Sequence, residues 1–229
     1  MHIAIVTGAS RGLGLALTRT LAERGWRVVV DARNGEALTA ATRGLAGVIP
    51  IPGDVADPAH RQALVDAAAA LGRLDLLANN ASLLGPSPQP RLADYPLDVL
   101  AAVSHVNTVA PLALAQAALP LLRRSRGRIL NITSDASVEA YEGWGGYGSS
   151  KAALDHISRV MAAEEPDVRV YAVDPGDMRT QMHQEAFPGE DISDRPLPEE
   201  SVPGLLALIE GSLPNGRYRA ADLMTGASA

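Results

Sequence analysis

The sequence of 229 residues contains no cysteine. A disulfide framework, a thiolate metal site and a cysteine nucleophile are therefore excluded. The histidines do not suggest another kind of metal site, because His2, His60 and His183 have no metal-ligating neighbour at a suitable spacing. His105 and His156 lie in helical patterns, where we expect packing or surface residues. The sequence predicts no bound metal.

Clustered basic residues and long uninterrupted apolar runs are also missing. Lysine and arginine are spread along a chain of net charge −6, which argues against a nucleic-acid partner. The most apolar long segment, Val99 to Leu122, is interrupted by polar residues and by Pro111, so it predicts a buried helix and no membrane partner. The N-terminus shows no signal-peptide pattern. We therefore expect a cytoplasmic protein.

What the chain does contain is enough apolar sequence for one sizeable core, since 47% of its residues are hydrophobic. Its length is normal for a single α/β unit. We find neither an internal repeat nor a linker. The sequence predicts that residues 1–229 form one dinucleotide-binding catalytic domain, in which the polar segment 176–200 is long enough to be a lid over a site.

Strand and helix patterns alternate along the chain. Strands are expected at residues 3–7, 28–30, 48–52, 74–78, 128–132, 168–173 and 216–220. Helices are expected at residues 13–24, 36–45, 57–71, 99–122, 146–165 and 201–209. This alternation predicts an α/β fold, a single-domain Rossmann-like doubly wound parallel sheet of about seven strands with helices on both faces.

Smaller signals agree with this arrangement. Pro50 and Pro52 favour an edge position for the third strand, which is also its position in the dinucleotide-binding strand order. Asp57 and Pro58 fit the N-cap and the first residue of the next helix. Gly25 fits the position just after the end of the first helix.

A glycine-rich turn, Gly8 to Gly14, joins the first strand to the first helix. In this context glycines allow a tight turn and close backbone approach, and a pyrophosphate meets the N-terminus of the helix. No Gly-Lys-Ser/Thr follows, so a nucleoside-triphosphate loop is set aside. The turn by itself is weak evidence for a dinucleotide.

Tyr147 and Lys151 lie four residues apart at the start of a helical pattern. At this spacing both side chains leave the same face of the helix, so an ammonium can lie beside a phenol. A neighbouring positive charge favours the phenolate and lowers the pKa of the tyrosine. The spacing alone would be explained as well by a surface pair without a role.

Six motifs in order resemble the short-chain dehydrogenase/reductase family in its short single-domain form, and the match covers essentially the whole chain. They are Thr7 to Gly14, which resembles TGxxxGxG; Asp54-Val55; Asn79-Asn80-Ala81, which resembles NNAG; Ser134, thirteen positions before Tyr147; Tyr147 with Lys151, which resembles YxxxK; and Asp174-Pro175-Gly176 through Thr180, which resembles PGxxxT. Asn107 lies where the family has its catalytic asparagine.

The resemblance implies that Asn107, Ser134, Tyr147 and Lys151 are catalytic. Tyr147 would donate a proton to a carbonyl oxygen while a nicotinamide delivers hydride to the carbon. Ser134 would hydrogen-bond that oxygen, Lys151 would lower the pKa of Tyr147 and bind the ribose, and Asn107 would position a proton-relaying water. Structural alternatives remain, because Ser134 could be a strand-end cap and Asn107 a satisfied polar group in a helix.

The same motifs, with Arg33, imply the cofactor-binding residues: Gly8, Ser10, Arg11, Gly12, Leu13, Gly14, Arg33, Asp54, Val55, Asn80, Ala81, Tyr147, Lys151, Pro175, Gly176 and Thr180. Ala32 occupies the position of the acid that would hold a free ribose hydroxyl, and Arg33 and Arg11 fit a 2′-phosphate. We therefore predict a preference for NADP(H). NAD(H) remains the alternative if Asp31 reaches the ribose.

The sequence also departs from the family pattern. Ser82 replaces the glycine of NNAG, which is expected to restrict backbone approach to the cofactor. The end of the chain, 221–229, lacks the glycine-rich ending through which many members form tetramers. The helix at 99–122 is apolar nearly all round, and in the family this helix and the one after Tyr147 form a two-fold interface, so the resemblance implies a homodimer or homotetramer.

The resulting hypothesis is an oxidoreductase acting on a small carbonyl compound or secondary alcohol. A non-catalytic dinucleotide sensor is the alternative, although a sensor has no need of a proton-transfer tyrosine. A nucleotide-sugar epimerase or dehydratase is disfavoured, because there is no room for its larger substrate domain. Five residues near the expected lid, Tyr141, Trp144, Met178, Met182 and His183, fit a pocket lining or lid packing equally well.

Overall fold

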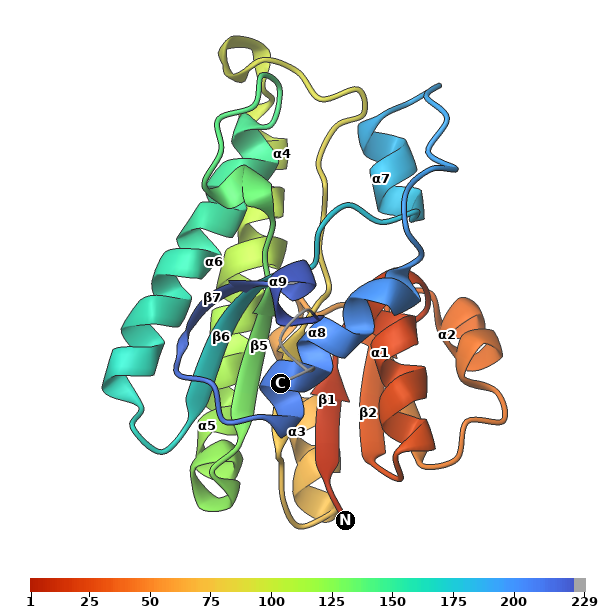
Figure 1. Cartoon of the computed structure of the whole chain (residues 1–229), viewed down its shortest axis with the longest axis vertical. Helices are drawn as coiled ribbons and strands as arrows, with labels where there is room; N and C mark the ends of the chain where they lie inside the picture. Colours follow the sequence, from red (N-terminus) through yellow and green to blue (C-terminus); the bar gives the residue numbers. More distant parts are fainter. Residues whose placement is uncertain (225–229) are drawn as a thin grey trace.

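The structure is a computed structural model and describes residues 1–224. Its centre is a sheet of seven parallel strands in the order β3-β2-β1-β4-β5-β6-β7 (Figure 1). The strands are β1 (Ile3–Val6), β2 (Arg27–Ala32), β3 (Val48–Pro52), β4 (Leu76–Asn79), β5 (Arg128–Ile132), β6 (Arg169–Asp174) and β7 (Gly216–Arg219). The predicted doubly wound sheet and the edge position of the proline-bearing β3 are confirmed.

Helices cover both faces of this sheet. They are α1 (Gly12–Glu23), α2 (Gly35–Thr42), α3 (Pro58–Ala70), α4 (Leu97–Ser104), α5 (Ala110–Ser125), α6 (Gly145–Glu164), α7 (Gln181–Ala186), α8 (Pro198–Glu210) and α9 (Ala220–Met224). Side chains of α1 and α8 pack on one face, and those of α3, α5 and α6 pack on the other. Strands buried on both faces need apolar residues at every position, which explains their continuous apolar runs.

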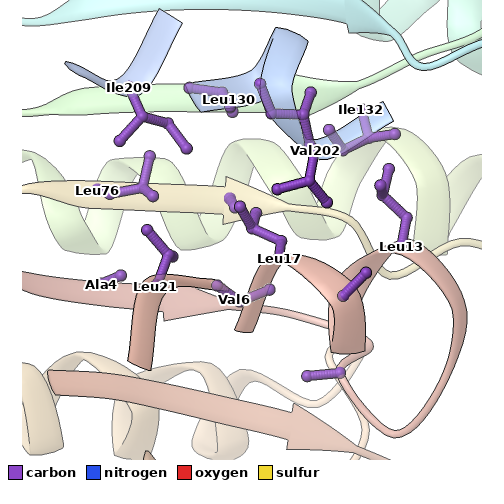
Figure 2. Close-up of a cluster of buried hydrophobic side chains, with 14 of the residues drawn as sticks. Ala4, Val6, Leu13, Leu17, Leu21, Leu76, Leu130, Ile132, Val202 and Ile209 are labelled. Atoms are coloured by element: carbon purple, nitrogen blue, oxygen red, sulfur yellow. The ribbon is translucent and has the colours of Figure 1, made fainter. Parts of the chain in front are cut away.

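Figure 2 shows the core on the first face. Leu17 and Leu21 of α1 meet Val202 and Ile209 of α8 over the central strands. These side chains are nearly inaccessible to solvent. The core fixes α1 against β1, and with it the position of the glycine-rich turn between them.

The expected local signals are present at the helix ends. Asp57 caps α3 by accepting a hydrogen bond from the amide of Ala59 at 2.9 Å. Gly25, just beyond α1, has a φ of +79°, a left-handed conformation that glycine adopts most easily. Predicted boundaries differ from the observed ones by a few residues.

The long apolar helix contains a feature that the sequence did not reveal. Between α4 and α5 the chain forms a π-helical turn, His105–Val109, so the helical run is continuous but has one wider turn. By length and composition alone, Leu97–Ser125 would be long and apolar enough to cross a membrane. That is weak evidence, because core helices of soluble proteins meet the same criterion.

Within one chain this helical run is buried over only part of its surface, and the predicted oligomer that would bury more of it stays a prediction. Only 28% of its most apolar stretch of 18 residues is buried. Leu97 and Val109 are 76% and 48% exposed. The reason is that the sheet covers one side only.

Segment 176–200 is not entirely irregular, since it contains the short helix α7. This helix lies beyond the carboxyl ends of the strands (Figure 1). Residues 225–229, which belong to the chain ending noted above, lie outside the described residues.

Candidate active site

A cavity of about 1460 Å³ lies at the carboxyl ends of the strands. Pockets for one drug-sized ligand are about 300–1,000 Å³, so this cavity can hold a dinucleotide together with a small substrate. It brings together nearly all the predicted site residues: Gly8, Ser10, Arg11, Gly12, Leu13, Arg33, Asp54, Val55, Asn80, Ala81, Ser134, Tyr147, Lys151, Pro175, Gly176 and Thr180. Gly14 and Asn107 do not line it.

Hydrogen bonds fix the glycine-rich turn to the end of β4. The Thr7 hydroxyl accepts the amides of Asn80 and Ala81, both at 3.0 Å, and the Asn80 side chain donates to the Thr7 carbonyl at 2.8 Å. Gly8 has a φ of +69°, and a Cβ there would lie 2.9 Å from the Cα of Ala81. The backbone of the turn must therefore lie directly against the backbone at the end of β4. The main role of Asn80 in this structure is to hold the two segments together by hydrogen bonds.

Gly14 has a packing role in this arrangement. A Cβ at this position would lie 2.5 Å from both the Gly8 carbonyl oxygen and the Nδ2 atom of Asn80. Any larger residue must displace the turn. Gly14 thus supports the cavity from behind, although we predicted it among the cofactor-binding residues.

The N-terminus of α1 fits the pyrophosphate of a dinucleotide. Arg11, the N-cap residue, makes no side-chain capping hydrogen bond, and the first turn contains no acidic residue. The first backbone amides of a helix lack partners within it and carry the positive end of the helix dipole. These amides are positioned to bind phosphate oxygens, because Gly12 and Leu13 line the cavity.

The carboxylate of Asp31, at the end of the cavity expected to hold the ribose, has hydrogen-bonding partners within the protein. Its carboxylate accepts the amide of Gly8 at 2.7 Å and lies 3.1 Å from Nε2 of His60, and the residue is 2% exposed. Both oxygens are therefore engaged inside the protein, on the side of α3. Ala32 and Arg33 follow it along the cavity wall.

Tyr147 and Lys151 are brought together on α6, as their spacing predicted. The Lys151 ammonium donates to the carbonyl of Ile132 at 2.8 Å and lies 5.5 Å from the centre of the Tyr147 ring. Lys151 is 2% exposed and Tyr147 8% exposed. The strand end at Ile132 thus holds the lysine beside the phenol.

The expected lowering of the Tyr147 pKa is not what the protein's own groups produce. Burial raises the pKa of Tyr147 to about 12; a hydrogen bond with Ser82 opposes this, while the charges of Asp174 and Asp135 add to it. Burial also lowers the pKa of Lys151 to about 8, against the raising effect of the Asp155 carboxylate. Loss of hydration is the largest cause of both shifts, so near neutral pH Tyr147 stays protonated.

Ser134 combines a cap with a place in the cavity wall. Its hydroxyl accepts the amide of Ala136 at 3.2 Å and donates to the Asp135 carboxylate at 2.9 Å. The capping alternative is therefore correct as a description of its hydrogen bonds. Since Ser134 also lines the cavity beside Tyr147, capping does not exclude contact with a substrate oxygen.

Arg217 of β7, which the sequence did not single out, fixes the backbone around Ser134. Its guanidinium donates to the Ser134 carbonyl at 3.0 Å, and it lies 3.1 Å from the Asp155 carboxylate and 3.5 Å from that of Asp174. Asp155 follows Lys151 by one helical turn. One arginine thus joins the ends of β5 and β6 to α6, the helix that carries Tyr147 and Lys151. Arg217 belongs to none of the sequence motifs.

Asn107 lies in the π-helical turn and is fully buried. Its side chain accepts the amide of Leu83 at 2.7 Å and donates to the Leu83 carbonyl at 2.9 Å and to the Ser150 hydroxyl at 3.0 Å. π-turns occur often at functional sites. Here the side chain joins the segment after β4 to α6, which matches the satisfied-polar-group alternative; the water-positioning role stays a prediction.

Ser82 also takes part in the site, although it appeared in the sequence only as a departure from the motif. It lines the cavity, and its hydroxyl donates to Oδ1 of Asn107 at 3.2 Å. Its interaction with Tyr147 lowers the pKa of that phenol, against the effect of burial. The hydroxyl that replaces a glycine therefore stands between two predicted catalytic residues.

The other end of the cavity is lined by α7 and by the loop before α6. Trp144, Met178, Met182 and His183 line it, so four of the five undecided residues belong to its wall. Tyr141 is not among the lining residues, and its hydroxyl donates to Asp135 at 3.0 Å. Leu84 and Ala186 complete an apolar wall that sequence patterns did not indicate.

Within the described residues no group of three or more histidine, aspartate or glutamate side chains could hold a metal ion. The fold and the cavity define a dinucleotide-dependent oxidoreductase. Residues 2–191 match the family model for short chain dehydrogenase, and the chain belongs to that family. The suspected resemblance is therefore confirmed.

Individual relatives agree with this class. The chain is 34% identical over 194 residues to a benzil reductase from Saccharomyces cerevisiae that forms (S)-benzoin. The aligned region covers 80% of this chain and 74% of the relative. It is 38% identical over 193 residues to a 3-oxoacyl-[acyl-carrier-protein] reductase of rhamnolipid biosynthesis from Pseudomonas aeruginosa, with 79% and 74% covered.

Solved structures show the same fold. A short chain dehydrogenase from Shigella flexneri complexed with NADP superposes with a TM-score of 0.87 at 29% identity, covering 96% of this chain and 97% of the other. The protein is accordingly an NAD(P)-dependent oxidoreductase that transfers hydride between a nicotinamide and a carbonyl compound or secondary alcohol. Tyr147 is its general acid/base.

Proposed function

We propose that the protein works as an NADP(H)-preferring carbonyl reductase. The observation that carries the cofactor choice is the state of Asp31, the acid at the end of β2, one residue before the position expected to hold a ribose hydroxyl. Its carboxylate is turned to the Gly8 amide and His60, while Arg33 lines the cavity at the expected ribose. A 2′-phosphate would there meet the guanidinium of Arg33.

The protonation state of Tyr147 supports the reducing direction. A pKa of about 12 keeps the phenol protonated near neutral pH, which is the form needed to donate a proton to a carbonyl oxygen. The nicotinamide supplies the hydride when bound. In the proposed roles Ser134 orients the carbonyl oxygen, and Lys151 holds the ribose and the charge beside Tyr147.

The cofactor assignment is tested by the kcat/KM for NADPH and NADH in the wild type and in Arg33→Ala. We expect the wild type to favour NADPH. Loss of one charge-assisted hydrogen-bonding group costs about 1.5–3 kcal/mol, so kcat/KM with NADPH should fall about 10-fold or more in the variant. Efficiency with NADH should change little. A wild type that uses NADH equally well would refute the assignment.

We also propose that the exposed side of the helical run Leu97–Ser125 is covered in a homodimer or homotetramer. The support is the exposed apolar surface at Leu97 and Val109, together with Val160 on neighbouring α6. Light scattering at micromolar concentration would decide between a monomer and an oligomer.

A further inference from the structure

Ser82 brings a hydroxyl into the cavity at a position where the NNAG pattern has glycine. The residue is half-buried and lines the same cavity as Ser134 and Tyr147. Among the non-glycine residues that the structure describes, Arg126 alone has a positive φ, so the backbone at Ser82 does not adopt a conformation that favours glycine. The serine is therefore accepted without left-handed strain, and its hydroxyl is an added polar group.

The hydroxyl of Ser82 has an acceptor that does not depend on it. It donates to Oδ1 of Asn107 at 3.2 Å, but the same oxygen accepts the backbone amide of Leu83 at the shorter distance of 2.7 Å. The amide nitrogen of Asn107 donates to the Leu83 carbonyl at 2.9 Å and to the Ser150 hydroxyl at 3.0 Å. Asn107 stays held when the Ser82 hydroxyl turns away, and a hydroxyl rotates easily to another acceptor.

The surroundings of the Tyr147 oxygen disfavour a negative charge. Burial raises the pKa of Tyr147 to about 12, and the carboxylates of Asp174 and Asp135 add to this effect. The ammonium of Lys151 lies 5.5 Å from the centre of the ring. Ser82 acts in the opposite direction to burial, because its interaction with Tyr147 lowers the pKa of the phenol. A hydroxyl that donates to the phenoxide oxygen has this effect.

Other charged groups surround this part of the cavity. Arg217 lies 3.5 Å from the Asp174 carboxylate and 3.1 Å from that of Asp155, and Asp177 and His183 line the cavity from segment 176–200. All of these groups are unchanged when position 82 is substituted. A comparison of variants at position 82 therefore isolates the effect of its hydroxyl.

Reduction of a ketone leaves a negative charge on Tyr147. The O–H bond of Tyr147 breaks, its proton goes to the carbonyl oxygen of the substrate, and hydride from the nicotinamide goes to the carbonyl carbon. The ketone is reduced to an alcohol, NADPH is oxidised to NADP⁺, and Tyr147 becomes a phenolate.

We propose that Ser82 is a further catalytic residue, whose hydroxyl turns from Asn107 to the Tyr147 oxygen and donates a hydrogen bond to the phenolate as it forms. Since this bond strengthens as charge develops, it stabilises the transition state more than the bound ketone. The inference rests on the acid/base role of Tyr147 and on the proposed carbonyl reductase function.

The ionisation of Tyr147 is measured without turnover by fluorine NMR, in protein whose five tyrosines carry a fluorine next to the hydroxyl. The fluorine lowers the pKa of each phenol and brings the titration to milder pH, and Tyr147→Phe identifies the resonance. Ser82→Ala removes only the hydroxyl oxygen. A hydrogen bond to a charged group changes an equilibrium about 10-fold, so the midpoint of Tyr147 should lie about 1 pH unit higher in this variant. Ser82→Thr keeps a hydroxyl and should titrate near the wild type.

The same contact is tested in turnover by following NADPH oxidation with a panel of aryl and alicyclic ketones that includes benzophenone and cyclohexanone. Ser82→Ala should lower kcat about 3- to 10-fold and change KM little, because the lost bond forms mainly in the transition state. Ser82→Thr should recover most of kcat. Ser212→Ala, at an exposed position after α8, is the matched control and should behave as the wild type in both measurements.

Melting temperatures identify any variant that is poorly folded. If Ser82→Ala is one of them, Ser82→Gly, which carries the residue of the NNAG pattern, replaces it in both measurements. A Tyr147 midpoint that stays at the wild-type value in Ser82→Ala, or that rises equally in Ser82→Thr, would overturn the role of Ser82 alone. Absence of NADPH oxidation with every ketone would overturn the proposed function, while a higher midpoint in Ser82→Ala would still support the contact between Ser82 and Tyr147.

Discussion

The two ends of the cavity are built differently. At the cofactor end, backbone atoms and short side chains meet at the ends of β1 and β4: Thr7, Gly8 and Asn80 are joined by short hydrogen bonds, and Gly14 leaves no space for a side chain. At the other end, segment 176–200 contributes long side chains and rings. Its ion pairs are exposed, as between Arg195 and Asp177 at 4.0 Å.

This difference explains why most of the motifs lie at the cofactor end, whereas in segment 176–200 only Gly176 through Thr180 belongs to one. Where one backbone lies in van der Waals contact with another, certain positions admit only glycine. This requirement produces a glycine pattern that can be recognised in the sequence. A wall of rings and aliphatic chains can be made from many combinations of residues. The residues that bind the cofactor can therefore be predicted from sequence motifs. The residues that select the substrate depend on tertiary packing and cannot be predicted in this way.

The largest effect is expected where both ends meet, at Tyr147. Tyr147→Phe should lower kcat by about 100-fold or more, because proton transfer by a positioned group is worth about that much. The ring still packs against Trp144, so NADPH affinity should change little. Steady-state kinetics and fluorescence titration with NADPH measure the two quantities. A variant that keeps a tenth of the activity would show that Tyr147 is not the general acid.

The contrast between the ends can be tested with two glycines. Gly14→Ala should destabilise the protein by about 1–3 kcal/mol and weaken NADPH binding, because a Cβ 2.5 Å from the Gly8 carbonyl and the Asn80 side chain forces the turn to move. Gly189→Ala in segment 176–200 has no atom within 4 Å of its new Cβ, and only its φ of +84° opposes alanine. It should cost about 1 kcal/mol.

Denaturant unfolding and NADPH titration of both variants measure these effects. We expect the lid variant to keep the cofactor affinity of the wild type. Equal loss of affinity in both variants would mean that the two ends are coupled, for which the hydrogen bond between Arg11 and Gln181 of α7 is the candidate contact.

Sequence reasoning predicted the sheet, its strand order at the edge and nearly the whole cofactor end, because each depends on local patterns. It did not predict the π-helical turn at Asn107, since helical periodicity continues through it. Arg217 was missed for another reason, because its three contacts come from segments far apart in the chain. The pKa of Tyr147 was misjudged because burial, which no spacing reveals, outweighs the lysine.

The smallest expected effect concerns the charge that supports Lys151. Burial lowers the Lys151 pKa to about 8, and the carboxylate of Asp155, one helical turn away, opposes this. If reduction needs the ammonium form, the rate declines as pH rises through this pKa. Asp155→Asn removes the opposing charge, so the Lys151 pKa should fall further and the alkaline limb of the kcat profile should move to lower pH.

Stability gives an independent reading of the same group. Because the folded-state pKa lies below the ordinary value of 10.5, the unfolded chain binds more protons between about pH 8 and 10.5, and Lys151 makes stability rise with pH in this window. In Asp155→Asn the window should begin at lower pH. Asp98→Asn, an exposed carboxylate on α4, is the control and should move neither profile. An unchanged alkaline limb in Asp155→Asn would show that Lys151 does not control the rate through its charge.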